Sequence, residues 1–368
     1  MSFSLKIDEL MKQGVVEGVF PGAVILAALG EKILIHQAYG YAVLNPRKEP
    51  AHLSTVYDLA SLTKPLATSL AVMALIREGK LRLDQSLSSL GQGFIFPGKE
   101  AITVRQLLAH SSGFPAYRPY YLPYSPEQTI DKGRLRSQVG QEALSYPPGC
   151  GTLYSDLGFI ILEGIIEDLS GQDLDLWTRE NLYKPLGLAR LGFRPRMGAG
   201  PVEAEAYAAT EYCPWRKKII RGEVHDENSF VVGGISGQAG LFGRAIDVFH
   251  LLRSLKKVYD DPQGSGLFEG PLVRAFWQKQ EEPAGTTRAL GFDTPAERES
   301  MAGRYFSGRS IGHLGFTGTS FWLDLETDLM VVLLSNRIHP SRTNEKIKLF
   351  RPLIHDLIFT EVFQMEKL

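Results

Sequence analysis

Apolar runs of strand length lie near both ends of the chain. Residues 23–29 and 33–42 flank the polar triplet "GEK", which predicts a β-hairpin with Gly30 in its turn. Residues 319–325 and 329–336 are separated by "ETD" and predict a second hairpin. Strands at both ends with helices between them favour one antiparallel sheet in which the two ends of the chain meet.

Helical patterns fill the rest of the chain. Apolar positions indicate an amphipathic N-terminal helix: Leu5, Ile7, Leu10, Met11 and Val15. Residues 61–78 are apolar nearly all round and predict a helix that ends at Gly79, with Pro65 in its first turn. Residues 343–363 predict a last helix, with apolar side chains on one face.

The middle of the chain, from about residue 102 to 280, alternates helical segments with Pro- and Gly-rich loops. Residues 114–126 hold four prolines and four tyrosines and predict an ordered loop, either lining a pocket or connecting elements on the surface. The patterns together predict an α/β (α+β) fold in a single domain, 1–368. One lobe joins 1–60 with 285–368 around the sheet, and 61–284 forms a mainly helical lobe.

Composition narrows the class of protein. The chain has 368 residues, 44% of them hydrophobic, which is enough for one large core. A net charge of -1 gives no basic field for nucleic acid or an anionic membrane. The N-terminal segment is too charged for a signal peptide, and Cys150 and Cys213 show neither a disulfide framework nor metal-ligand spacing. We expect a cytoplasmic protein with two free thiols and no metal.

Ser61 and Lys64 stand three residues apart in an otherwise apolar run, "YDLASLTKPLATSL". At a helix N-terminus, backbone N–H groups and the helix dipole favour the negative charge of an oxyanion beside Ser61. A neutral Lys64 at the next turn would accept the serine proton, which requires a pKa near 7 instead of about 10.4. The spacing is a weak signal, because Ser254 and Lys257 repeat it within a plain helical pattern.

A rival nucleophile lies in "GRSIG", residues 308–312, which matches the nucleophile elbow of α/β-hydrolases. Asp324 and His339 follow Ser310 in the required order. That elbow needs a helix directly after the serine, whereas the following residues predict turns and a strand. Ser310 is therefore the weaker candidate.

Four ordered blocks resemble the serine β-lactamase-like superfamily of class C β-lactamases, D-alanyl-D-alanine peptidases and related esterases. They are "ASLTKP", "ITVRQLLAHSSGFP", "PPGCGTLYSDLGFIILEGIIEDLSG" and "GHLGFTGTSFWLD". The segment 221–243 is similar to a further block of the non-lactamase members. The resemblance covers roughly residues 10–360 and implies the β-lactamase/transpeptidase-like fold.

The resemblance also implies roles for individual residues. Ser61 would be the acylated nucleophile, Lys64 its base and Tyr154 the proton shuttle to the leaving group. His313 and Gly315 would belong to the third element, on the edge strand of the sheet. The backbone N–H groups of Ser61 and Phe316 would form the oxyanion hole.

Two departures from the family pattern concern substrate binding. Asp156 stands where β-lactamases place an asparagine, so an amide donor is lost and a carboxylate favours the charged form of Lys64. "HLG" replaces Lys-Thr-Gly, so a mostly neutral His313 and the apolar Leu314 replace the pair that grips a substrate carboxylate. Some peptidases of the superfamily carry histidine there.

Three other segments have plainer interpretations. Residues 225–228, His-Asp-Glu-Asn, are read as a loop that binds its own backbone, in preference to a metal site. The glycine-rich run 233–240 has no Lys-Ser/Thr after it and predicts a tight turn beside the pocket. His110 and Ser111 are interpreted as a helix C-terminal cap.

The leading prediction is a serine hydrolase that cleaves an ester through a Ser61 acyl-enzyme, without a cofactor. The alternative is a D-amino-acid peptidase or weak β-lactamase, which the histidine at 313 leaves open. A non-catalytic binding protein on the same fold is the alternative of another class. The substrate would be a small ester, amide or β-lactam, with neither nucleic acid nor membrane as a partner, and the oligomeric state stays open.

Overall fold

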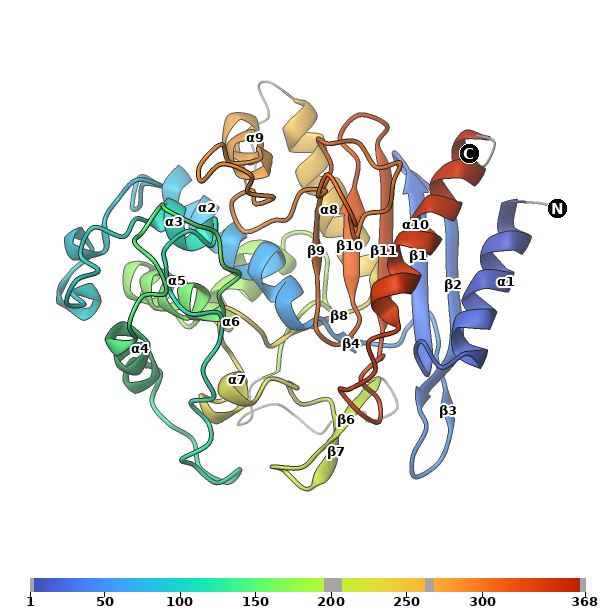
Figure 1. Ribbon diagram of the computed structural model, residues 1–368, viewed down its shortest axis with the longest axis horizontal. Coiled ribbons are helices and arrows are strands. Elements are labelled where there is room, and N and C mark those ends of the chain that lie inside the picture. The colour runs from blue at the N-terminus through green and yellow to red at the C-terminus, as the bar shows by residue number, and fades with distance from the viewer. Residues whose placement is uncertain (1–2, 195–206, 262–267, 365–368) are drawn as a thin grey trace.

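A computed structural model describes residues 3–194, 207–261 and 268–364, and its largest element is a six-stranded antiparallel sheet. The strands lie in the order β3 (Glu49–Pro50), β2 (Lys32–Val43), β1 (Gly22–Leu29), β11 (Leu329–Ser335), β10 (Ser320–Leu323) and β9 (Ile311–Leu314). The centre of the sheet joins the two ends of the chain, because Leu26 of β1 pairs with Val332 of β11. The N- and C-terminal helices lie side by side beyond it (Figure 1).

Both faces of the central strands are buried, which explains their continuous apolar runs. Alternate residues point to opposite faces, so Ile25 packs with helices α1 (Phe3–Val16) and α10 (Ile347–Phe363). Its neighbour Leu26 belongs to the larger core on the other face, which includes α8 (Ala245–Asp260). The sheet thus separates two hydrophobic cores.

The helical part of the molecule lies beside the β9 edge of the sheet (Figure 1). Its first segment runs as a 3-10 turn (Ala60–Leu62), a π-helix (Lys64–Thr68) and α2 (Ser69–Arg77). The other helices are α3 (Val104–Leu108), α4 (Lys132–Gln141), α5 (Asp156–Ser170), α6 (Leu174–Thr178) with a π-helical extension (Arg179–Tyr183), α7 (Glu227–Val231) and α9 (Gly270–Trp277). Short 3-10 turns span Leu87–Ser89 and Gln92–Phe94.

Two small sheets complete the fold. One contains β4 (Tyr57–Asp58), β8 (Leu241–Gly243) and β5 (Gly192–Phe193), and the other contains β6 (Ala209–Cys213) and β7 (Lys218–Arg221). The sheet of β4 and β8 lies directly before the 3-10 turn that carries Ser61. It therefore helps to position that serine.

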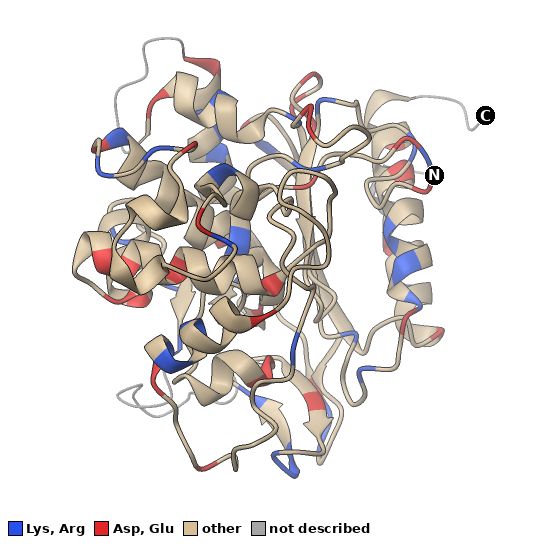
Figure 2. Ribbon diagram, turned by 60° about the vertical axis from the view of Figure 1, so that its left-hand side comes forward, with Lys and Arg blue, Asp and Glu red and all other residues tan. Residues whose placement is uncertain are grey.

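The structure confirms the predicted fold class, both hairpins and the helical segment that begins near Ser61. Gly30 has a positive φ of 59° in the first hairpin turn. None of the helices in the described ranges is long and apolar enough to cross a lipid bilayer. Acidic and basic residues are interspersed over the helices and loops (Figure 2).

Candidate active site

The turn that carries Ser61 is held in an unusual backbone conformation. Ala60 has a φ of 49°, which side-chain-bearing residues rarely adopt. The buried Asp58 stabilises it, because one carboxylate oxygen accepts the Ala60 N–H at 2.8 Å and the other accepts the His225 N–H at 2.7 Å. Thr317 and Thr319 donate to the carbonyl oxygens of residues 58 and 59, which ties the turn to the β9–β10 connection. The nucleophile candidate thus sits on a firmly fixed turn.

Lys64 lies next to Ser61, as the spacing predicts. Its side chain has no solvent exposure, and its Nζ is 3.1 Å from Ser61 Oγ. The same nitrogen donates to the Gln238 carbonyl oxygen at 3.0 Å and lies 2.7 Å from Asp156 Oδ1. The buried ammonium group therefore has three oxygen neighbours.

The charge on Lys64 departs from the sequence-based expectation. Burial opposes the charge, but the Asp156 carboxylate and the Tyr154 side chain outweigh it and raise the pKa of Lys64 above its ordinary value. The expectation of a neutral Lys64 at pH 7 is therefore wrong for the free protein. The physical reason is Asp156, which stands where β-lactamases carry an uncharged asparagine.

Tyr154 is positioned by a helix cap. His110 has a φ of 57° and follows α3 as the left-handed residue of a Schellman motif, in which the Ser111 N–H donates to the Gln106 carbonyl. This confirms the capping interpretation. The His110 ring also accepts the Ser155 N–H at 3.0 Å and lies 4.5 Å from the Tyr154 ring. The cap thus fixes Tyr154 and the start of α5.

His313 and Gly315 lie on β9 and just after it, as the resemblance implies. Burial, with the charges of Lys64 and Arg288, lowers the pKa of His313 well below its ordinary value, so its ring is neutral at pH 7. A Cβ atom at Gly315 would collide with the Thr319 hydroxyl and lie 2.7 Å from the Leu59 carbonyl oxygen. Only glycine allows these segments to approach so closely.

One cavity of about 640 Å³ joins all the predicted site residues except Lys64, which lies directly beneath it. The predicted residues that line it are Ser61, Tyr154, Asp156, His313, Gly315 and Phe316. Tyr117 and Tyr121 of the loop 114–126 line it too, so this loop has the pocket-lining position that was one of its two predicted alternatives. The catalytic roles of the predicted site residues, Ser61, Lys64 and Tyr154 among them, stay predictions.

Sequence reasoning did not place the charged residues that surround these groups at the site, and of them it named only Asp226 and Glu227, as part of the segment 225–228. The cavity is also lined by Asp226, Glu227, Arg288, Asp293, Arg337, Arg342, Lys348 and Arg351. They come from distant segments, and no local motif marks them. Arg288 is close to the predicted proton shuttle, since its guanidinium lies 5.3 Å from the centre of the Tyr154 ring.

Two of the cavity arginines form no ion pair among the described residues, although the charge of Glu345, which pairs with Lys348, acts on Arg337 from a distance. Arg337 donates to carbonyl oxygens, including that of Phe316 at 2.9 Å, and its guanidinium lies 4.8 Å from the Phe316 ring centre. Arg351 donates to the carbonyl oxygens of Gly315 and Thr319. Burial and the neighbouring Arg337 lower the pKa of Arg351 to about 9. This end of the cavity therefore has an unbalanced positive charge.

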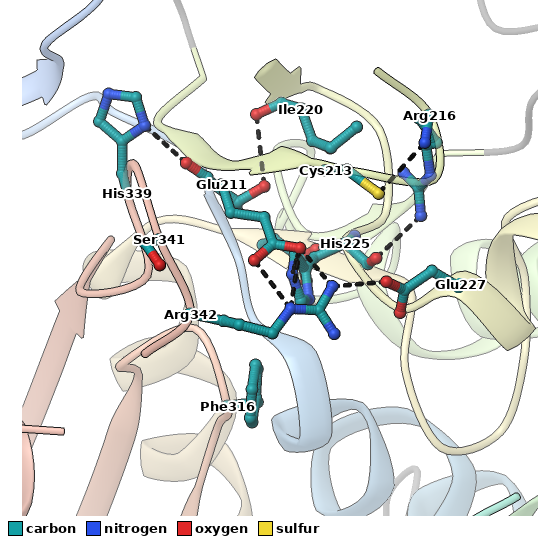
Figure 3. Close-up of polar contacts among 12 residues, drawn as sticks. Glu211, Cys213, Arg216, Ile220, His225, Glu227, Phe316, His339, Ser341 and Arg342 are labelled. Atoms are coloured by element: carbon teal, nitrogen blue, oxygen red, sulfur yellow. Dashed lines mark hydrogen bonds and ion pairs between the residues drawn. The ribbon is translucent and has the colours of Figure 1, made fainter. Parts of the chain in front are cut away.

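An ionic cluster, drawn in Figure 3, contributes to the wall of the cavity. Arg342 binds the carboxylates of both Glu211 and Glu227, and His225 Nε2 lies 3.2 Å from Glu211. The His225 ring is stacked on Phe316, with 5.6 Å between the ring centres. Glu211, Glu227 and the buried Cys213 also lie close enough together to hold a metal ion, but the carboxylates already bind Arg342. We assign the cluster a structural role.

The segment 225–228 matches its plainer interpretation in part. Asp226 caps the short helix α7 by accepting the Ser229 N–H at 2.7 Å, so it does bind local backbone. The glycine-rich run 233–240 forms a tight turn beside the pocket, as predicted, and three of its glycines have positive φ. Gln238 and Ala239 of this turn line the cavity.

The other serine candidates lie in a different context. Ser310 is fully buried and is followed by strand β9, so the nucleophile-elbow interpretation fails. Asp324 accepts hydrogen bonds from Ser307 and His339 lies against Thr210, so neither contacts Ser310. Ser254 donates to a carbonyl within α8 while the exposed Lys257 pairs with Glu31, so this copy of the spacing brings no reactive pair together.

The fold, together with a serine and a lysine in hydrogen-bond contact at a cavity, defines a class of serine hydrolases. Comparison with known families identifies it: the family model named Beta-lactamase matches residues 7–353. The chain belongs to the beta-lactamase family and is a serine hydrolase of that family.

Relatives and solved structures agree with this assignment. A protein of Escherichia coli O157:H7 with the provisional name D-alanyl-D-alanine carboxypeptidase is 32% identical over 91% of this chain and 82% of its own length. An N-acetylmuramyl-L-alanine amidase of Bacillus subtilis strain 168 is also 32% identical, over 91% of this chain and 81% of its own length. The solved structure of EstCE1, a hydrolase with promiscuous acyltransferase activity, has a TM-score of 0.74 at 22% identity and covers 95% of this chain and 98% of its own. This last likeness shows the fold.

Proposed function

We propose that the protein is a D-amino-acid peptidase that hydrolyses the amide bond of a small peptide through a Ser61 acyl-enzyme. The names of the two relatives at 32% identity, a carboxypeptidase and an amidase, support an amide substrate. They favour the peptidase alternative over the ester hydrolase that leads the sequence-based predictions. The similarity to the EstCE1 structure, at 22% identity, concerns the fold and does not favour an ester substrate.

The observation that carries the proposal is the unbalanced positive charge at the cavity. A peptide that loses its C-terminal residue presents a carboxylate on the leaving group, and among the described residues neither Arg337 nor Arg351 forms an ion pair that would compete for it. Arg288 lies over the Tyr154 ring, where the leaving group departs in this mechanism. Arginines thus take over the carboxylate-binding task that the "HLG" sequence has lost.

The reaction proceeds in two steps. Ser61 Oγ attacks the amide carbon, its proton passes to the Lys64 amine, and the backbone N–H groups of Ser61 and Phe316 stabilise the oxyanion. Tyr154 donates a proton to the leaving amine and regains one from Lys64, which lies 4.9 Å from its ring centre. Water then attacks the seryl ester and releases the acyl product.

Lys64 enters this cycle only after it loses its proton. Asp156 Oδ1 is 2.7 Å from Lys64 Nζ and stabilises the charged form of the lysine, so it opposes the loss of that proton. Asp156 would thereby set the fraction of protein in which Lys64 is neutral and can accept the serine proton.

The cytoplasmic location stays a prediction, which fractionation of the native host tests.

Parallel assays with a D-alanyl-D-alanine peptide, p-nitrophenyl butyrate and nitrocefin test the proposal. We expect the peptide to have the highest kcat/KM, and Ser61→Ala to lower it at least about a thousandfold. Intact-mass measurement after a reactive penicillin should map the adduct to Ser61. Ser254→Ala is the matched control, because it removes a serine with the same spacing to a lysine, and it should react as the wild type does.

Efficient ester turnover without peptide turnover would return the assignment to a carboxylesterase. An adduct that persists in Ser61→Ala and disappears in Ser310→Ala would move the nucleophile.

A further inference from the structure

The cavity has a second unbalanced charge, which is negative. Four carboxylates line it, and three of them form ion pairs: Asp156 with Lys64, Glu227 with Arg342, and Asp293 with Arg288. Asp226 is the fourth and has no ion pair among the residues that the structure describes. A carboxylate at a cavity wall without a cation is incompletely satisfied.

The known contacts of Asp226 leave room for a ligand. Its Oδ1 accepts the Ser229 N–H at 2.7 Å and the Gln238 side-chain amide at 3.3 Å. The charge of Arg216 acts on it from a distance, but this guanidinium donates to the carbonyl oxygens of Val224 and His225. The Ser229 side chain also contributes a hydrogen bond, so the carboxylate of Asp226 has hydrogen-bond donors but no cation in direct contact among the described residues.

Asp226 is close to the reacting groups. Gln238 links them directly: its side-chain amide binds Asp226, and its backbone carbonyl binds Lys64 Nζ at 3.0 Å. Burial raises the pKa of Asp226, and the charge of Asp156 raises it further, so the two carboxylates lie within electrostatic range. Burial raises the pKa of Tyr117, which also lines the cavity, and the charges of Asp226 and Asp156 raise it further.

We infer that Asp226 is a specificity-determining residue that binds a primary ammonium group on the acyl portion of the substrate. The proposed function gives the carboxylate of the leaving group to Arg337 and Arg351, and we assign the ammonium group of the acyl portion to Asp226, which lies beside Asp156 and the reacting groups. Tyr117 and Tyr121 add ring faces, which attract cations. This inference rests on the proposed function and adds that the acyl portion of the substrate carries a positive charge.

Matched substrates that differ only in the charge of an amine test the inference. The peptide pairs are D-Ala-D-Ala with its N-acetyl derivative, and Nα-acetyl-Lys-D-Ala-D-Ala with its Nα,Nε-diacetyl derivative. A third pair, the p-nitrophenyl esters of 6-aminohexanoate and 6-acetamidohexanoate, reports the same preference without an amide bond. The readout is the ratio of kcat/KM between amine and acetylated substrate within each protein variant.

We expect the wild type to prefer the amine at least about tenfold in one or more pairs, as a charge-assisted hydrogen bond implies. Asp226→Asn should reduce that ratio to about one. Asparagine keeps the helix-capping oxygen, so α7 is retained. Asp131→Asn is the matched control, since Asp131 caps α4 in the same way outside the cavity, and its ratio should equal that of the wild type.

Ratios near one for every pair in the wild type, or a preference that Asp226→Asn keeps, would overturn the inference. If the esters show the preference and the peptides are not cleaved, the inference stands and the peptidase proposal fails. If the peptides are cleaved without any preference, the peptidase proposal stands and the inference fails.

Discussion

Lys64 combines complete burial with a charge that its surroundings stabilise. The cost of burying an ammonium group is offset by an ion pair with Asp156 and by hydrogen bonds to Ser61 and the Gln238 carbonyl. A base must be neutral to accept a proton. Asp156 therefore has two effects on Lys64: it holds the side chain in place, and it reduces the fraction of the lysine that is neutral. A substitution can separate these two effects.

Asp156→Asn should shift the pH dependence of catalysis. Without the carboxylate the pKa of Lys64 falls, since burial then acts against the charge with less opposition. Lys64 works in its deprotonated form, so the acidic limb of the kcat/KM profile should move to lower pH, and the gain should be largest below neutrality. Profiles with a reactive ester from pH 5 to pH 9 measure the shift.

An acidic limb that stays at the same pH in Asp156→Asn would show that another group controls the reaction. Circular dichroism of the variant at each pH separates this result from unfolding.

The residues of the site differ in how far the sequence could reveal them. Ser61, Lys64 and Tyr154 carry recognisable spacing, and the structure places them together. Asp226 looks like an ordinary helix cap in the sequence, and Arg351 like any polar residue of an amphipathic helix. Their position at the cavity depends on tertiary contacts between distant segments, which leave no periodic trace.

Short elements at the cavity wall are joined by an ionic cluster. Strand β6, helix α7 and the loop after β11 meet at Arg342, which binds Glu211 and Glu227 (Figure 3). Burial would raise the pKa of Glu211, but hydrogen bonds from Arg342 and His225 lower it to about 2. Phe316 stacks on His225, so this cluster also contacts the residue whose backbone N–H is predicted to belong to the oxyanion hole.

Glu211→Gln should lower stability in a pH-dependent way. The folded-state pKa of Glu211 lies below its ordinary value of 4.5, so its contribution is present above about pH 4.5 and is lost as the pH falls toward 2. We expect the variant to lose about 1–3 kcal/mol of unfolding free energy at pH 7, and the difference from wild type to shrink below pH 4.5. Urea denaturation at several pH values measures this.

Glu180→Gln is the control for that experiment, because Glu180 pairs with Arg179 and Lys184 at the protein surface. Exposed pairs contribute little, so its stability should follow the wild type. Equal effects of the two substitutions would contradict the importance of the buried cluster.

Regular elements were easier to predict from the sequence than their ends. The hairpins follow from apolar runs on either side of short polar turns, and the buried helix after Ser61 follows from its composition. The last helix begins at Ile347, four residues after its predicted start at 343. Asn344 explains the difference, because its side chain donates to the carbonyl oxygens of Gly18 and Val19 and so holds a turn against the N-terminal segment.

The molecule as a unit is built on a sheet with a core on each face. Helix α1 and most of α10 cover one face of the sheet away from the cavity, and the residues of α10 that line the cavity, Ile347, Lys348 and Arg351, lie at its start. Stability and catalysis should therefore respond separately to changes in that outer layer.

Met11→Ala tests this separation. Met11 is fully buried in α1 against the sheet, so its truncation should cost about 2–5 kcal/mol of unfolding free energy while kcat/KM stays near that of the wild type. Leu5→Ala is the matched control on the same helix, because Leu5 is 49% exposed and should change stability by less than about 0.5 kcal/mol. A large loss of kcat/KM in folded Met11→Ala would show that the outer layer is coupled to the site.

The pairing of β1 with β11 has a consequence for biosynthesis. Strand β1 leaves the ribosome roughly three hundred residues before β11, the neighbour with which it pairs. Until then its apolar backbone edge is open to wrong partners, and nascent chains of this kind rely on chaperones. A premature stop before residue 329 would therefore yield an aggregating product in place of a smaller working enzyme.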